Sequence, residues 1–301
     1  MQKTTITANE ANQRLDKFIH RRLGRPPKSF VQKMLRKKNI TVNGRKADGA
    51  FMLAEGDVVK LFISEKTAEK FAAPAKTFPK GDVVVVYEDN YVSLLNKPAG
   101  LSVQPDIAGG DSLIGRLRGH YNSDFAPVAI NRLDKNTTGL VICAKILPAA
   151  QALSKLMHDR KIQKIYLGVA QGEIAMRMTL QGTHTKDRER NIAKIAHDGD
   201  GKAAHTHIVP LKYCATKDLT LLEIHLHTGR SHQIRAHLQS IGHPLLGDIK
   251  YGGKKAGRQL LHAHQLIFPK LDGVLANLSN KTFTAPPPLD FLIYTKTSSK
   301  Q

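Results

Sequence analysis

The first 64 residues carry two helical patterns followed by short strands. Apolar residues recur at the spacing of one helix face in the first pattern, at Leu15, Phe18, Ile19 and Leu23. Two prolines end this helix, and the second pattern starts behind them, with an inner face of Phe30, Val31, Met34 and Leu35. Runs at 40–42 and 58–63 predict strands. The first run leads into a tight turn at 43–44, and the second follows a turn at 55–57. This segment is therefore predicted to be a small α/β domain.

Strand patterns dominate the rest of the chain, and helices are interspersed without a regular repeat. Strands are predicted at 83–86, 91–95, 139–143, 165–170, 206–211 and 220–226, and helices at 149–158 and 234–241. This order is typical of an α+β fold with a large, mostly antiparallel mixed sheet and flanking helices. We expect an N-terminal domain at 1–64, a linker at 65–82, a main domain at 83–295 and a polar tail at 296–301.

Composition narrows the class of protein. The chain of 301 residues is 41% hydrophobic, which excludes a disordered polyelectrolyte. Its two cysteines exclude a disulfide scaffold and favour a reducing, cytoplasmic setting. The first residues contain no apolar run, and nowhere do about 18 uncharged apolar residues follow one another. We therefore expect a soluble protein with no standard export signal and no membrane span.

Charge points to a polyanionic partner. There are 46 Lys and Arg against 25 Asp and Glu, a net charge of +21, and residues 1–70 alone contribute +9. Excess positive charge strengthens association with polyanions, of which nucleic acid is the commonest. A basic helix face is also an ordinary solvated surface, so charge by itself says nothing about chemistry.

A polar loop leads directly into the strand predicted at 139–143. It contains Arg132 two residues before Asp134, followed by Asn136, Thr137 and Thr138. A loop of this kind holds a carboxylate at a strand end, where catalytic groups are often placed. The same spacing also fits an Asx or Ser/Thr turn that merely caps the strand, and both interpretations remain open on spacing alone.

A second polar cluster surrounds the start of the helix predicted at 234–241. It contains Arg230 and Arg235, together with Gln233 and His237. Two guanidinium groups and several hydrogen-bonding side chains suit a phosphate or a carboxylate partner. Arg235 borders the apolar stripe of the helix, where an unpaired charge would be costly. A merely solvated amphipathic helix therefore explains the pattern less well.

Histidines at alternate positions raise a metal site as another hypothesis. Three such pairs occur, at His205 and His207, His225 and His227, and His262 and His264. Alternate residues of a strand point to one face, so each pair could share an ion. No Cys, Asp or Glu stands at a consistent distance to complete a ligand set, which weighs against this hypothesis.

Four short motifs mark the N-terminal domain: QRLDKF at 13–18, PKS at 27–29, LRK at 35–37 and VNG at 42–44. Together they resemble the S-four-type RNA-binding domain over roughly residues 12–64. The resemblance implies that the second helix and the loop after it face RNA phosphates. The basic residues expected to bind RNA are Arg14, Lys28, Lys33, Arg36, Lys37 and Lys38.

A longer series of motifs runs in order through the main domain. These are NKPAGL at 96–101, NRLDKNTTGL at 131–140, KIYL at 164–167, GKAAHT at 201–206, TGRSHQIR at 228–235, GHPLLGD at 242–248 and LHA at 261–263. Together they resemble the RluA-type pseudouridine synthases over most of residues 83–270. Asn131 stands where that family usually has His, and His205 and His207 depart from the family's usual residues in a strand.

The resemblance implies a base-flipping enzyme that isomerises uridine to pseudouridine in RNA, a reaction that needs no cofactor and no metal. The family's catalytic Asp corresponds to Asp134, which would act as nucleophile on the sugar or as base; the sequence does not choose. The family's salt-bridge partner of this Asp corresponds to Arg235. A guanidinium beside Asp134 would favour its ionised form, which either role requires. Arg132 corresponds to the residue that fills the vacated stack, and Tyr166 to the residue that stacks on the flipped uracil.

The N-terminal motifs look most like the RluC-like subgroup, whose substrate is large-subunit ribosomal RNA. We therefore expect ribosomal RNA or pre-ribosomal particles as partner, and transfer RNA is the alternative substrate. We expect a monomer without an obligatory protein partner and without membrane association. A non-catalytic RNA-binding assembly factor on the same fold is a further alternative, against which the intact site residues argue.

Overall fold

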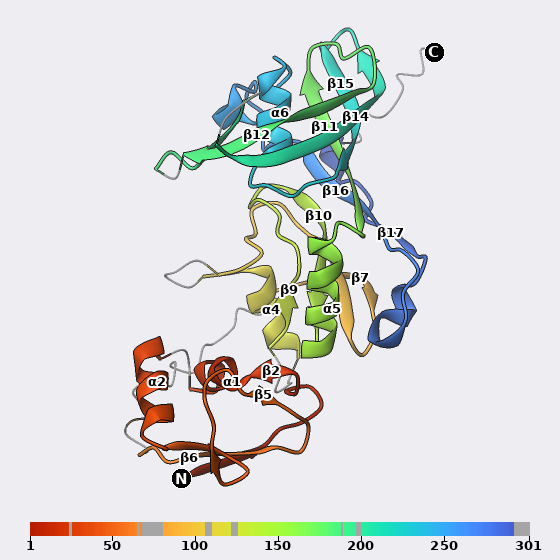
Figure 1. Cartoon of the computed structure of the whole chain (residues 1–301). Helices are drawn as coiled ribbons and strands as arrows, with labels where there is room; N and C mark the ends of the chain where they lie inside the picture. Colours follow the sequence, from red (N-terminus) through yellow and green to blue (C-terminus); the bar gives the residue numbers. More distant parts are fainter. Residues whose placement is uncertain are drawn as a thin grey trace. The chain divides into compact units, whose positions relative to one another are not determined.

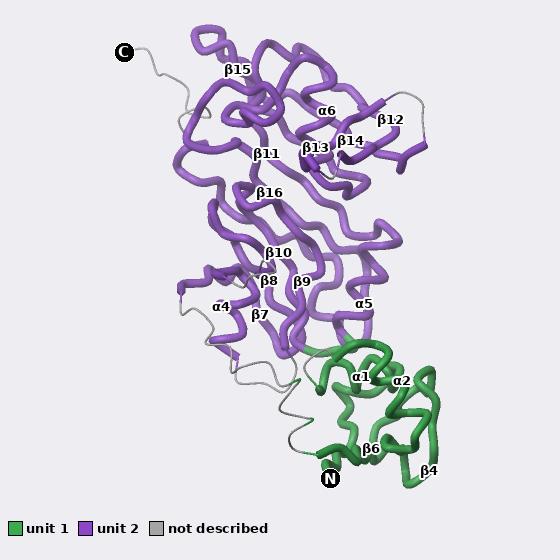
Figure 2. Tube along the Cα trace, turned by 90° about the vertical axis from the view of Figure 1, so that its left-hand side faces the viewer, with its two compact units in different colours: residues 1–78, 146–148 green, residues 79–145, 149–301 purple. Residues whose placement is uncertain are grey.

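The computed structural model describes residues 1–23, 26–64, 67, 71, 81–105, 110–121, 126–187, 189–196 and 200–291. Most of the linker predicted at 65–82 and all of the tail predicted at 296–301 lie outside these residues. The chain divides into two compact units (Figure 2), one of residues 1–78 with 146–148 and one of residues 79–145 with 149–301. Among the described helices, none has the length and apolar character needed to cross a membrane.

The first unit has the two predicted helices, α1 (Leu15–Arg22) and α2 (Lys28–Arg36). Its antiparallel sheet has the order β1 (Gln2–Thr5), β6 (Val58–Leu61), β3 (Ile40–Val42) and β4 (Arg45–Lys46), and β2 (Gln13–Arg14) pairs with β5 (Met52–Leu53). The apolar faces predicted for both helices are buried in one core, which also takes in Ile40, Val59 and Leu61. Local periodicity therefore accounts for most of this unit.

The second unit is built on one large sheet of eleven described strands. Nine follow one another in the order β13 (Ile192–Ala196), β12 (Met178–Asp187), β14 (Lys202–Cys214), β15 (Leu219–Leu226), β11 (Gln163–Gln171), β16 (Leu261–Ile267), β10 (Thr138–Ala144), β8 (Val92–Lys97) and β7 (Val84–Glu88). Two short strands extend it, β17 (Thr282–Thr284) beside β16 and β9 (Val128–Ala129) beside β10. Among the strands that the structure describes, only β10 and β16 pair in parallel, so the prediction of a mostly antiparallel α+β fold is confirmed.

The helices of this unit lie against the sheet (Figure 1). They are α4 (Leu113–His120), α5 (Leu147–His158), α6 (Gln233–Ser240) and the 3₁₀ helices η1 (Ile249–Tyr251) and η2 (Gly273–Leu278). Apolar side chains of α4 and α6 share a buried core with the sheet, including Leu117 of α4, Ile234 of α6 and Val141 of β10. Helices α4 and α6 thus cover apolar sheet surface.

The parallel pairing of β10 and β16 positions the polar loop that precedes β10. Gly139 pairs with Ala263, and it has φ +108°, a conformation that L side chains rarely adopt. A β-carbon at this position would lie 2.2 Å from the Ala263 carbonyl oxygen, so only glycine lets the two strands approach. The Thr-Thr-Gly sequence therefore brings the end of the loop directly against β16.

Candidate active site

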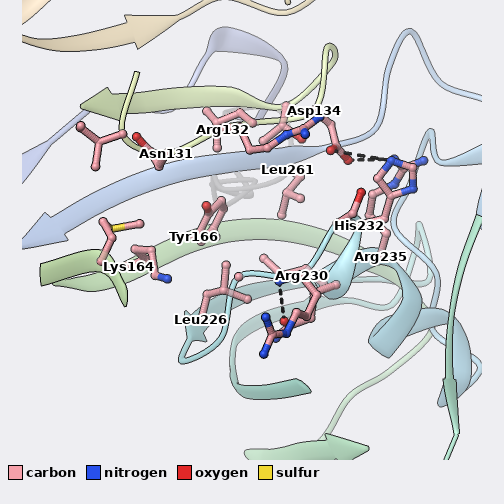
Figure 3. Close-up of a pocket in the computed structure, with 18 residues that line it drawn as sticks. Asn131, Arg132, Asp134, Lys164, Tyr166, Leu226, Arg230, His232, Arg235 and Leu261 are labelled. Carbon is pink, nitrogen blue, oxygen red and sulfur yellow. Dashed lines mark hydrogen bonds and ion pairs between the residues drawn. The ribbon is translucent and has the colours of Figure 1, made fainter. Parts of the chain in front are cut away.

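The four residues predicted to be catalytic line one cavity of about 340 Å³. Arg132 and Asp134 come from the loop before β10, Tyr166 comes from β11, and Arg235 comes from α6 (Figure 3). These segments are up to about a hundred residues apart in the chain. The fold thus brings together all four candidates that the motifs identified.

Arg235 connects two carboxylates. Its Nη1 donates a hydrogen bond of 2.9 Å to Oδ2 of Asp134. Its Nε and Nη2 donate to the two carboxylate oxygens of Asp248 at 2.6 and 2.7 Å, a two-pronged arrangement that fixes the plane of the guanidinium. Asp248 is 2% exposed and Arg235 is 6% exposed, whereas the Asp134 side chain is 25% exposed. Of the three charged groups, Asp134 is thus the one that is exposed to the cavity.

The paired carboxylates keep Arg235 charged inside the protein. Burial acts to lower the pKa of Arg235, but the hydrogen bonds and charges of Asp248 and then of Asp134 outweigh it and raise that pKa. The ring of Tyr251 supports the guanidinium from one side, with 4.7 Å between the ring centre and the Arg235 Cζ. Arg235 therefore presents a fixed positive charge to Asp134.

A buried lysine, Lys97, holds the backbone of the loop that contains Asp134. Lys97 is 0% exposed, and its Nζ donates to the carbonyl oxygens of Lys135, Pro98 and Leu101 at 2.8 to 2.9 Å. Burial lowers the pKa of Lys97 to about 8, although the charge of Asp134 acts in the opposite direction. The lysine therefore ties the loop to the end of β8 through backbone groups alone.

The loop also has the turn character that its sequence allows. The Thr137 amide donates to the Asp134 carbonyl oxygen at 3.0 Å, and the Thr137 hydroxyl accepts a hydrogen bond from Gln259 at 2.8 Å. The turn is made by backbone groups, and among the described residues no side chain of 134–138 accepts a loop amide, so the Asx or Ser/Thr turn that the spacing also allowed is not formed. The loop is a tight turn that leads into β10, and its geometry directs the Asp134 carboxylate into the cavity.

A second group lies beside the other oxygen of Asp134. Nε2 of His232 is 3.8 Å from Oδ1 of Asp134, and its Nδ1 is 3.0 Å from the hydroxyl of Tyr251. That hydroxyl accepts a hydrogen bond from the Ala193 amide at 2.8 Å, so its own proton is available for Nδ1. Burial is the main cause that lowers the pKa of His232. When the Tyr251 hydroxyl donates to Nδ1, the proton of neutral His232 is on Nε2 and faces the carboxylate.

Tyr166 and Arg132 form opposite kinds of surface in the cavity. Tyr166 is 7% exposed, and burial followed by the charge of Asp134 raises its pKa well above the ordinary value, so the phenol keeps its proton at neutral pH. Its hydroxyl makes no hydrogen bond with a described residue. Arg132 is exposed and lines both this cavity and a neighbouring one of about 850 Å³. The buried ring of Tyr166 forms part of the cavity wall, whereas the exposed guanidinium of Arg132 is a charged group at the cavity's edge.

The residues that depart from the family pattern have local structural roles. The Asn131 side chain donates to the Leu140 carbonyl oxygen at 3.1 Å and accepts from the Ile142 amide at 2.8 Å, so it fastens the loop to β10. His205 of β14 stacks on His227, which directly follows β15, with ring centres 4.3 Å apart. Within the described ranges of the chain, no three His, Cys, Asp or Glu side chains converge as a metal would require.

Several residues of this site were not predicted as functional, among them Asp248 and Lys97. Both stand inside quoted motifs, at 242–248 and 96–101, but nothing in the spacing assigns them a partner. The available signal was the cost of burying Arg235, since a guanidinium next to an apolar stripe requires a carboxylate. The sequence could thus indicate that a partner exists, but it could not distinguish between Asp134 and Asp248.

The predicted RNA-binding residues lie in the first unit. Arg14 forms an ion pair with Asp16, with 2.7 Å between Nη2 and Oδ2, so its charge is partly neutralised. The other five candidates lie on α2 or in the turn after it, are exposed, and form no ion pair within the described part of the chain; they are Lys28, Lys33, Arg36, Lys37 and Lys38. This surface is a cluster of unneutralised positive charge.

Comparisons with known proteins agree with this geometry. Residues 91–240 match the RNA pseudouridylate synthase family model, and residues 13–59 match the S4 domain. The ribosomal large subunit pseudouridine synthase C of Rickettsia bellii is 32% identical over 85% of this chain and 90% of the relative. The protein of the same description from Escherichia coli is 30% identical over 86% of this chain and 82% of the relative.

A solved structure shares the fold. Human RNA pseudouridylate synthase domain containing 1 has a TM-score of 0.54 at 23% identity, and the match covers 74% of this chain and 96% of that one. The identity and coverage of the bacterial relatives are high enough to fix the family. The chain therefore belongs to the RNA pseudouridine synthase family and carries an S4 domain at its N-terminus.

Proposed function

We propose that this protein converts uridine to pseudouridine in large-subunit ribosomal RNA, with Asp134 as the essential group. The reaction breaks the bond between ribose C1′ and uracil N1 and forms a bond between C1′ and C5. The hydrogen on C5 is lost and N1 gains a proton, so the composition of the nucleoside does not change. The observation that carries the proposal is a partly exposed carboxylate in a cavity, held by an arginine that a buried carboxylate fixes in place.

Asp134 acts next to the anomeric carbon in either of two ways. As a nucleophile it would bond to C1′ while uracil leaves; as a base it would remove the proton on the neighbouring C2′. Arg235 supports both roles because its positive charge stabilises the carboxylate. Tyr166 is well suited to stack on the free uracil and, since its phenol stays protonated, to donate a hydrogen bond to it.

Arg132 has the exposure that a base-flipping residue needs. A uridine stacked in a helix cannot reach Asp134, so it leaves the stack at a cost of a few kcal/mol. An exposed guanidinium at the rim of the cavity can occupy the vacated space and stack on the bases above and below it. In this proposal the basic surface around α2 holds the RNA backbone while Arg132 fills the gap.

Ribosomal RNA is proposed as the substrate because the bacterial relatives are described as ribosomal large subunit enzymes and because the chain carries an S4 domain. We further propose that the protein acts in the cytoplasm as a monomer, without cofactor or obligatory protein partner. The reaction is redox-neutral overall and transfers no phosphoryl group, so it needs no external oxidant, reductant or phosphate donor.

Release of the C5 hydrogen gives a direct assay. Purified protein is incubated with large-subunit ribosomal RNA or with transfer RNA, each transcribed with uridine tritiated at C5, and tritium in water is measured. We expect release from the ribosomal RNA and none above background from transfer RNA. Release from transfer RNA alone would replace the substrate assignment. Tight binding of ribosomal RNA without release would instead identify a non-catalytic RNA-binding protein.

A further inference from the structure

A third cavity, smaller than the two already described, lies beside the candidate active site. It has a volume of about 280 Å³ and shares four lining residues with the first cavity, which are Met157, Lys164, Gly229 and Arg230. Its other lining residues are His158, Arg160, His227 and Thr228. Three of the eight residues are Lys or Arg and two are His, and none is Asp or Glu. The lining therefore favours an anion.

Lys164 is the distinctive member of this lining. It is 8% exposed, yet no carboxylate or hydrogen-bond acceptor among the described residues pairs with its Nζ. Burial, with a further contribution from the charge of Arg160, lowers the pKa of this amine. Keeping an unpaired ammonium inside a protein costs free energy. Lys97 shows the contrast, because it is buried as deeply but donates to three carbonyl oxygens.

The acidic residue nearest to Lys164 in sequence, Asp159, does not neutralise its charge. Asp159 is already engaged by Lys155 at 2.5 Å and by His158 at 3.0 Å, and it is not part of the cavity lining. The Nζ of Lys164 instead lies close to Gly229, 3.8 Å from where a β-carbon of that residue would stand, and Gly229 borders both cavities. The ammonium group therefore lies among the residues that line both cavities.

We propose that Lys164, with Arg160 and Arg230, forms a subsite for one phosphodiester group of the RNA strand that carries the target uridine. The inference rests on the proposed function, because it takes RNA as the ligand. Lys164 and Tyr166 are two residues apart on β11, so their side chains leave the same face of the sheet about 7 Å apart. If Tyr166 stacks on the flipped uracil, an adjacent backbone phosphate lies within reach of Lys164. The phosphate supplies the counter-charge that the protein lacks.

The subsite predicts opposite effects on RNA binding and on stability. Lys164→Met keeps the length of the side chain and removes its charge. We expect the Kd for a large-subunit ribosomal RNA transcript to rise about tenfold or more, because a charge-assisted hydrogen bond to phosphate is lost. The slope of log K against log salt should fall by about 0.7 to 0.9. The free protein should melt at the same or a higher temperature, because an unpaired buried charge is removed.

Matched variants make the test specific. Lys161→Met removes an exposed charge three residues earlier, outside either cavity, and should leave the Kd within about twofold. Lys164→Arg should restore most of the salt slope. All variants are measured by equilibrium binding in an Asp134→Asn background, so that no RNA is converted during the experiment.

An unchanged salt slope in Lys164→Met, with or without weaker binding, would overturn the subsite, because no phosphate contact would have been lost. A lower melting temperature of the free variant would also overturn it, since Lys164 would then be a structural residue. Neither result depends on turnover. Absence of tritium release from wild-type protein would contradict the proposed function alone, and the two failures are therefore distinguishable.

Discussion

Helices α2 and α6 both carry basic side chains, but the two regions use them in opposite ways. Lys28, Lys33 and Arg36 of α2 are exposed and form no ion pair with any described residue. Arg235 of α6 is 6% exposed and lies between two carboxylates. Exposed charges add little to stability and are free to meet a polyanion, whereas a buried charge must be paired. We therefore predict that the exposed charges of α2 bind RNA and that the buried, paired Arg235 supports the chemistry.

The largest expected effect is on the buried pair. Asp248→Asn leaves Arg235 without its two-pronged partner, and breaking a buried ion pair costs about 3 to 5 kcal/mol of unfolding free energy. Uridine conversion should fall as well, because the guanidinium no longer holds Asp134. Urea unfolding measures the first effect and tritium release the second.

The control is the more exposed pair of Arg258 and Asp290, whose carboxylate side chain is 42% exposed. Asp290→Asn should cost no more than about 1 kcal/mol. Equal urea midpoints for the two variants would show that burial does not distinguish these pairs.

Buried histidines give an intermediate effect that depends on pH. Burial lowers the pKa of His237 and of His262 to about 4, from an ordinary value of 6.5. Because the unfolded chain binds these protons first, stability is complete above pH 6.5 and is lost as pH falls toward 4, by roughly 2 to 3 kcal/mol for each histidine.

Urea unfolding at pH 7 and pH 4.5 tests this. His262→Gln should lose less stability between the two pH values than the wild type, because it lacks the buried imidazole. A His262→Gln protein with the wild-type pH dependence would show that His262 does not contribute to acid unfolding.

The smallest expected effect on stability belongs to α2. Replacing Lys28, Lys33 and Lys37 together by Gln should change the unfolding free energy by less than about 0.5 kcal/mol, since all three are exposed. The same protein should bind ribosomal RNA more weakly and with a shallower salt dependence.

A second triple variant, with Lys3, Arg45 and Lys46 changed to Gln, removes the same charge from exposed sheet positions of the first unit. It should retain most of the affinity. If both triple variants lose affinity equally, net charge rather than the α2 surface governs binding.

The same contrast explains what could be predicted from sequence. Both helices of the first unit follow from apolar spacing, because each buries a local face such as Leu15, Phe18 and Ile19. In the second unit β10, β11 and α6 were predicted within a few residues, but α4, β12, β13 and β16 were among the elements that were missed. β16 reads LHAHQLI, and its two histidines are accommodated by hydrogen bonds to the Thr138 hydroxyl and the Ala285 carbonyl oxygen, which a local pattern does not reveal.

The site shows the same limit. The family motifs identified Asp134 and Arg235, which are 101 residues apart and form a hydrogen bond. Asp248 and Lys97 could not be identified, because their roles exist only after α6, η1 and β8 are assembled. Lys164 was quoted as part of a motif, but its burial without a partner is a property of the folded cavity. Contacts of this kind depend on tertiary packing rather than on periodicity.

Tritium release by Asp134→Asn is the most direct test of the carboxylate's role. With C5-tritiated large-subunit ribosomal RNA, we expect the rate to fall by at least about 10³-fold while the Kd stays within a few-fold of wild type, because the RNA contacts remain and only the reacting group is lost. Asp290→Asn, treated in parallel, should release tritium normally. Release by Asp134→Asn at the wild-type rate would contradict the assignment of this carboxylate as the essential group.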